Sequence, residues 1–203
     1  MINHIWGLLA NPGREWRNID REKESITHLY ARHVLLMALI PVVSAFIGTT
    51  QIGWHLGGEA YKVAVPTAAA LGIVFYILML IGVAIMGNVI HWMSDSFASR
   101  PTRRRCIIFA GYVATPLFIA GIALLYPKAW LLLAVGIVAL AYSARLLYVG
   151  MPAFLRIPVN EGLTISGGTL AIGVLVLELL LALTVALWGL GFNDYAVSWS
   201  LFR

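Results

Sequence analysis

The sequence predicts an all-α fold: a bundle of five transmembrane helices preceded by an N-terminal interfacial helix. Three observations support this prediction. Hydrophobic residues make up 61% of the 203 residues and charged residues only 11%, about half the charged fraction of a typical soluble domain. Five long apolar runs each reach the ~20 residues that a helix needs to cross ~30 Å of hydrocarbon. The basic residues between these runs are concentrated on alternate connections.

The apolar runs define the predicted spans and leave little room for a separate soluble domain. Each run is continuously apolar rather than alternating, which favours helices over the strands of a membrane barrel. A helix also satisfies its own backbone hydrogen bonds in lipid. We therefore divide the chain into a cytoplasmic amphipathic segment, residues 1–32, and a five-helix membrane domain, residues 33–203. The predicted spans are residues 34–54, 66–92, 106–126, 129–149 and 169–190.

The distribution of basic residues predicts the orientation. Ten lie on the side of the N-terminus: Arg14, Arg17, Arg21, Lys23, Arg32, Arg100, Arg103, Arg104, Arg105 and Arg156. Only Lys62, Lys128 and Arg203 lie on the other side. Cytoplasmic loops carry the excess of Lys and Arg, so we expect the N-terminus in the cytoplasm. An odd number of spans then puts the C-terminus on the opposite, outer side of the membrane.

The first 32 residues are polar and basic, and we expect them at the inner surface of the membrane. The sequence Asn11-Pro12-Gly13 is a turn signal. Residues 14–24 mix both charge signs at helical spacing, which predicts a short helix on the inner leaflet with Trp6 and Trp16 at headgroup level. The alternative is a frayed tail. Further along, Pro41 and Pro116 lie inside spans and predict kinks, because each removes one backbone hydrogen bond.

Glu178 is the most unusual residue, because it lies near the predicted centre of the fifth span among leucines and valines. An acidic group there should face the bundle interior and have a partner, and we expect it to be uncharged for much of the time near pH 7. Thr115 and Tyr112 are the candidate partners by depth. The site is either a proton or cation site or a structural interhelical clamp. Arg145, close to the inner end of the fourth span, either snorkels to the headgroups or pairs with Glu178.

The basic inner face predicts contact with anionic lipid headgroups, since each Lys or Arg near such a surface contributes ~1 kcal/mol. The candidate residues are Arg14, Arg17, Arg21, Arg103, Arg104 and Arg105. We expect no metal and no cofactor: His91 and Asp95 are one turn apart, but no metal-ligand motif is present. No catalytic constellation is visible either, so we expect the protein not to be an enzyme.

Three segments carry a resemblance to a known family. They are GTTQIGW at residues 48–54, FAGYVATPLF at 109–118 and LAIGVLVLE at 170–178, and the opening Trp6-Gly7-Leu8 adds to them. With these segments the chain resembles the bacterial branch of the Yip (Ypt-interacting protein) family over nearly its whole length. The resemblance implies five membrane helices with a cytoplasmic N-terminus. The Gly111-Tyr112 pair matches a family feature of the third span.

Eukaryotic members of this family are linked to Rab-type GTPases and vesicle traffic, but this chain lacks their Asp-Leu-Tyr-Gly-Pro motif. A GTPase partner is therefore not supported, and nucleic acid is not expected either. Two hypotheses remain for a protein of the bacterial inner membrane. One is a non-catalytic scaffold or lipid-organising protein, and the other is a small transporter or channel that uses Glu178. Both are compatible with a homo-oligomer.

Overall fold

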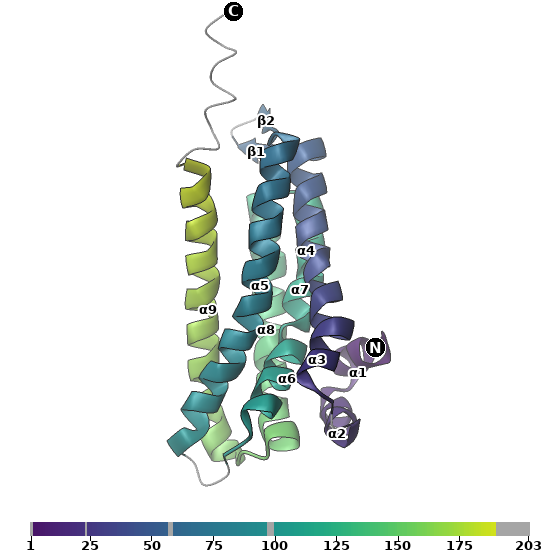
Figure 1. The fold of residues 1–203 in the computed structure, drawn as a ribbon, viewed down its shortest axis with the longest axis vertical. Helices are drawn as coiled ribbons and strands as arrows, with labels where there is room; N and C mark the ends of the chain where they lie inside the picture. The colour runs from purple at the N-terminus through teal and green to yellow at the C-terminus, as the bar shows by residue number, and fades with distance from the viewer. Residues whose placement is uncertain (1, 23, 57–58, 97–99, 190–203) are drawn as a thin grey trace, which may run out of the picture.

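The computed structural model is a bundle of long helices that stand side by side, with two short helices packed against its side near one end (Figure 1). It describes residues 2–22, 24–56, 59–96 and 100–189; within α9 the side chains of residues 177–189 are not described. The predicted all-α fold class and the multi-span character of the chain are confirmed. One departure is a short antiparallel hairpin, β1 (Trp54–Leu56) with β2 (Glu59–Tyr61), which pairs Trp54 with Tyr61.

In the part of the chain that the structure describes, four helical segments are long and apolar enough to cross a membrane: Ile26–Ile52, Val65–Met93, Arg103–Leu125 and Ala129–Leu155. The first combines α3 (Ile26–Leu29), the π-helical η1 (Tyr30–Val34), α4 (Leu35–Ile47) and the π-helical η2 (Gly48–Ile52). It begins eight residues before the predicted start at residue 34. The difference has a local cause: the Ser25 side chain accepts a hydrogen bond from the backbone N–H of His28 and so caps the helix in the polar segment.

The second span is α5 (Val65–Met93), with Pro66 in its first turn, followed by the short 3₁₀ turn η3 (Ser94–Ser96). The fourth combines α8 (Ala129–Gly150) with the π-helical η5 (Met151–Leu155). The last helix, α9 (Val159–Gly189), has 31 residues and packs against α5, α8 and η5. It begins ten residues before the predicted start at residue 169, because Gly167 and Gly168 lie inside the helix rather than in a loop before it.

The third span is interrupted in its middle. It consists of α6 (Arg103–Val113), α7 (Thr115–Ala120) and the 3₁₀ turn η4 (Gly121–Leu125). The break at Ala114 lies two residues before Pro116, whose ring and missing N–H do not fit a helix interior. The Ser143 hydroxyl of α8 donates a 3.0 Å hydrogen bond to the Val113 carbonyl that ends α6. The kink predicted from Pro116 is therefore present, and a neighbouring span supports it.

The flanks of the bundle expose rows of large aliphatic side chains. On α5 the exposed residues follow one another at intervals of four: Ile73, Ile77, Ile81 and Ile85. On α8, Leu133 and Ile137 have the same spacing. Soluble monomers rarely expose contiguous apolar surface of this extent, whereas lipid tails solvate it well. The flanks therefore fit a hydrocarbon environment.

The two short helices are α1 (Ile2–Ala10) and α2 (Pro12–Glu22), separated at Asn11. They lie against the side of the bundle near the end at which the first and third spans begin, which we call the capped end (Figure 1). Leu8, Trp16 and Ile19 belong to the same buried apolar cluster as residues of the spans. The N-terminal helices are thus part of the folded core.

Candidate functional site

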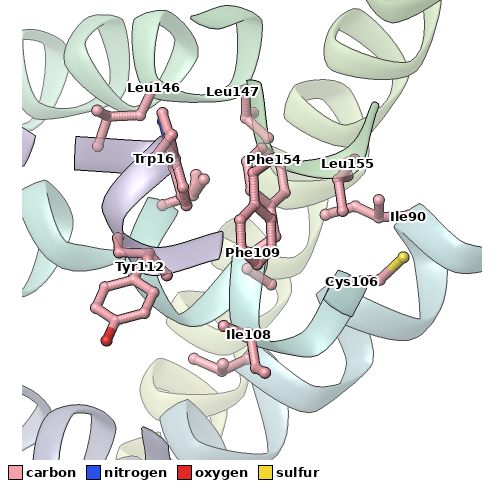
Figure 2. Packing of buried hydrophobic residues seen from close by; sticks show 14 of the residues in the cluster. Trp16, Ile90, Cys106, Ile108, Phe109, Tyr112, Leu146, Leu147, Phe154 and Leu155 are labelled. Atoms are coloured by element: carbon pink, nitrogen blue, oxygen red, sulfur yellow. The ribbon is translucent and has the colours of Figure 1, made fainter. Parts of the chain in front are cut away.

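Trp16 anchors α2 in the bundle. Its indole is fully buried, with the ring centroids of Phe109 and Phe154 at 4.7 Å and 5.5 Å, and Figure 2 shows these three rings together. Gly150 of α8 makes the room, because a Cβ there would lie 2.7 Å from the indole. Trp16 therefore packs against protein, and the expected contact of its side chain with headgroups is absent. Trp6, in contrast, is 68% exposed.

The docking of Trp16 and Ile19 turns the other face of α2 outward. Arg14, Arg17 and Arg21 are all exposed on that face, so their side chains are available to a surface outside the protein. The amphipathic pattern of this helix was visible in the sequence. Its apolar face, however, packs against protein, on α8 and η5, in place of the predicted contact with lipid.

A cavity of about 410 Å³ opens between α2, the start of the first span, the start of α6 and η5. Asp20 and Glu24 supply negative charge to its lining, while Arg104 and Arg105 supply positive charge. Thr102 adds a hydroxyl, and three apolar side chains complete the lining. A cavity with both signs of charge suits a ligand that itself carries both.

The three predicted headgroup arginines at the start of α6 differ in their contacts. Arg105 forms a 2.6 Å ion pair with Asp20, hydrogen-bonds the Phe154 carbonyl and lies with its guanidinium 4.8 Å from the Phe154 ring centroid. Arg103 donates to the Asn88 side chain at 2.5 Å. Arg105 therefore joins α6 to α2 and η5, which gives it a structural role that the sequence did not reveal. Arg104 is exposed and faces the cavity.

Glu24 connects the cavity to the interior of the bundle. Its Oε2 accepts a 2.7 Å hydrogen bond from the Tyr112 hydroxyl, and its Oε1 lies 2.8 Å from Nδ1 of His28. The Glu24 side chain is only 8% exposed. Buried carboxylates are retained where they have partners, and Glu24 has two. Tyr112, one of the predicted site residues, is thus engaged by an acid from the first 32 residues.

His33 and Thr115 form a second buried polar pair, deeper in the bundle. Nε2 of His33 lies 2.9 Å from Oγ1 of Thr115, and both residues are 1% exposed. The imidazole also packs on the Tyr112 ring, with the centroids 4.7 Å apart. His33 lies in the π-helical turn η1, and Thr115 begins α7 directly after the break in the third span. π-Helical turns within α-helices, such as η1, are frequent at functional sites.

A third contact holds α1 on α2. The His4 imidazole hydrogen-bonds Glu15 through Nδ1 and lies 3.2 Å from Glu22 through Nε2. Its ring meets Tyr112 edge-on at 6.2 Å. Acidic and histidine side chains from residues 4–33 thus converge on Tyr112. Sequence reasoning missed Glu24 and His33 as site residues, because Glu24 lies in the polar segment interpreted as surface and His33 lies at its boundary, one residue before the first predicted span.

The remaining predicted site residues lie elsewhere. Glu178 is in α9, but its side chain lies outside the described residues, so its partner stays a prediction. The described partners of Tyr112 and Thr115 are Glu24 and His33. Arg145 is exposed, with its guanidinium 5.7 Å from the Tyr142 ring centroid, and the Tyr142 hydroxyl donates to the Leu8 and Leu9 carbonyls of α1.

The comparison with known proteins fits this architecture. The Yip1 domain profile matches residues 6–192. The chain belongs to the Yip1 domain family. It is also 57% identical, over 193 residues, to the inner membrane protein YohC of Escherichia coli strain K12 and to that of strain CFT073; each alignment covers 95% of this chain and 99% of the relative. The family resemblance stated from the sequence is confirmed. No solved structure matched the chain.

The family match begins at residue 6, so it includes part of α1 and all of α2 as well as the spans. The name of the relatives states a membrane location and no enzymatic activity. Among the described residues, no group of three or more His, Cys, Asp or Glu side chains is placed to hold a metal ion. His91 instead contacts the Pro101 carbonyl, and Asp95 pairs with Arg100.

Proposed function

We propose that this protein is a non-catalytic membrane scaffold that organises phospholipids at its capped end. One observation carries the proposal: α2 is docked through its apolar face, so that Arg14, Arg17 and Arg21 are all presented outward. A basic helix fixed to a membrane bundle is positioned to attract anionic headgroups. The exposed Arg104 adds a fourth cation near the same end.

The same proposal includes the topology. We place the capped end in the cytoplasm and the C-terminus in the periplasm of a bacterial inner membrane, on the basis of the asymmetric basic residues. The 31 residues of α9 measure about 46 Å as a helix, more than the ~30 Å that a span needs. Counted as a span, α9 brings the total to five. In this orientation α1 and α2 lie at the inner leaflet.

The packing beyond Thr115 favours a scaffold over a pore. Ala38 and Phe118, one turn further along their spans than His33 and Thr115, are buried and apolar. The next close approach joins Pro41 to Gly121, where a Cβ would lie 2.4 Å from the proline Cβ. The described interface between the first and third spans therefore becomes dry and tightly packed just beyond the polar pairs.

Native mass spectrometry tests the proposal. The triple variant Arg14→Gln/Arg17→Gln/Arg21→Gln should retain at least tenfold less phosphatidylglycerol or cardiolipin than the wild type, because each cation contributes ~1 kcal/mol near an anionic surface. The matched control is Lys62→Gln/Lys128→Gln, which removes two exposed cations on the other connections. Equal retention by the triple variant and the wild type would refute the proposal.

A small transporter or channel using Glu178 is the second candidate. The buried pairs Glu24–Tyr112 and His33–Thr115 favour it, because ionisable groups within membrane helices often mark ion or proton paths. In proteoliposomes under a pH gradient, this function predicts a proton flux that Glu178→Gln abolishes while the fold is kept. If Glu178 is only a clamp, Glu178→Gln should match the wild type in every assay.

A further inference from the structure

The charged cavity has an apolar neighbour. A groove of about 490 Å³ runs between the start of the first span, α5 and α6, lined by Ile26, Tyr30, Leu80, Ile81, Ala84 and Ile107. Glu24, just before α3, lines the cavity, and Ile26 and Thr27, the first two residues of α3, line the groove. On α6, Arg104 and Ile108 line the cavity, and Ile107 lines the groove.

These residue positions place cavity and groove side by side. Arg104 is three residues from Ile107 and four from Ile108 on α6, so it is a surface neighbour of one residue of the groove and one of the cavity. The packing of α3 on α6 brings the other lining residues to the same seam. A ligand can therefore occupy both spaces only if one part of it is charged and the part attached to it is apolar.

The charges of the cavity narrow the choice of ligand. Arg104 is the exposed cation of the lining, and guanidinium groups bind phosphate well. Glu24 is a carboxylate with two acceptor oxygens that can each accept a further hydrogen bond. Asp20 is already paired with Arg105 and Arg156, so a ligand with an anionic phosphate alone would meet the negative charge of Glu24 and offer it no cation. A headgroup with a phosphate and a primary ammonium meets a partner for each charge.

We propose that the cavity and groove together form a binding site for one aminophospholipid, a lipid whose headgroup carries a phosphate and a primary ammonium. Arg104 binds the phosphate, Glu24 accepts hydrogen bonds from the ammonium, and an acyl chain lies along the groove. The site deepens the proposed lipid-organising function by naming a lipid class. It is distinct from the outward arginines of α2, which act on anionic lipids as a group.

Native mass spectrometry with phosphatidylethanolamine, phosphatidylcholine and phosphatidylglycerol of identical acyl chains tests the site. The variant Arg14→Gln/Arg17→Gln/Arg21→Gln, which lacks the separate anionic-lipid surface of α2, should retain one phosphatidylethanolamine about tenfold more than either of the others. The wild type should show the same ratio over phosphatidylcholine, and a tenfold ratio equals ~1.4 kcal/mol. Phosphatidylcholine keeps the positive charge but has no N–H to donate, and phosphatidylglycerol has no cation. Equal retention of all three lipids by the wild type would overturn the proposal.

Glu24→Gln is the decisive variant. The amide oxygen can still accept from Tyr112, which preserves the fold, while the negative charge toward the ammonium is lost. The preference for phosphatidylethanolamine should disappear, and Glu22→Gln, an exposed acid of the same segment that does not line the cavity, should keep it. An unchanged preference in Glu24→Gln would overturn the proposal.

Two further variants separate the parts of the site. Arg104→Gln should lower the retention of all three lipids, because each has a phosphate. Ala84→Phe should fill the groove and lower phosphatidylethanolamine retention severalfold without changing the order among lipids. Arg14→Gln/Arg17→Gln/Arg21→Gln should leave the phosphatidylethanolamine preference intact. If the triple variant keeps its anionic lipids and Glu24→Gln loses its preference for phosphatidylethanolamine, the scaffold proposal fails and the specific site stands. If the triple variant loses its anionic lipids and Glu24→Gln keeps its preference, the scaffold proposal stands and the specific site fails.

Discussion

The Tyr112 hydroxyl donates a 2.7 Å hydrogen bond to the Glu24 carboxylate across 88 residues of sequence. It joins the polar segment before the first span to the last turn of α6, next to the break in the third span. The two residues belong to different predicted domains, yet they form one contact in one core. The N-terminal helices and the membrane bundle therefore form a single structural unit.

Removal of this hydrogen bond should loosen the segment before the first span. Tyr112→Phe leaves Glu24 largely buried with one partner fewer, which costs about 1–3 kcal/mol. Hydrogen–deuterium exchange in detergent should show faster exchange in α2 and α3. A double-mutant cycle with Glu24→Ala should give a coupling of at least ~0.5 kcal/mol. Additive effects of the two changes would contradict the direct contact.

Trp16→Ala should release α2 from the bundle. Loss of a large buried aromatic side chain costs about 3–5 kcal/mol, so protease cleavage within residues 12–22 should become faster. Trp16→Phe should lose much less, because the indole N–H has no hydrogen-bond acceptor among the described residues. Trp6→Ala, at an exposed position, is the matched control. Equal protection of α2 in Trp16→Ala and Trp6→Ala would rule out the anchor.

Arg105→Ala should lower the stability of the protein, whereas Arg104→Ala should lower lipid binding. Arg105 pairs with Asp20 and the Phe154 carbonyl, so its loss should destabilise the docking of α2 by about 1–3 kcal/mol. Arg104→Ala should leave the stability of the protein unchanged in lipid-free detergent. Thermal inactivation and native mass spectrometry on both variants separate the two roles. If Arg104→Ala lowered the stability and Arg105→Ala left it at the wild-type value, the structural role would belong to Arg104 and the prediction would be wrong.

The proposed orientation predicts which side of the membrane a cysteine can be labelled from. A cysteine introduced at Ser99 should react with an impermeant reagent only after the inner membrane is opened, whereas one at Lys128 should react in intact spheroplasts. Cys106 is fully buried and should give little background. Labelling of the Ser99→Cys variant from the periplasmic side would refute the topology.

The first four spans could be predicted because apolar composition alone identifies them. The break near Pro116 was also predictable, since it follows from the chemistry of one residue. The contacts of Trp16, Glu24 and His33 were not. Each depends on partners 82 or more residues away in sequence, and a single amphipathic helix does not reveal whether its apolar face meets lipid or protein. Gly150 was the available signal for Trp16, but its meaning appears only when α2 and α8 are brought together.

The position of Trp16 also sets an order of events during synthesis. Its pocket requires Phe109, Gly150 and Phe154, so residue 16 leaves the ribosome long before the residues that will enclose it. Helix α2 can therefore dock only after the fourth span has been inserted. Until then α2 is accessible to chaperones and proteases, and its docking reports that most of the bundle has been assembled correctly.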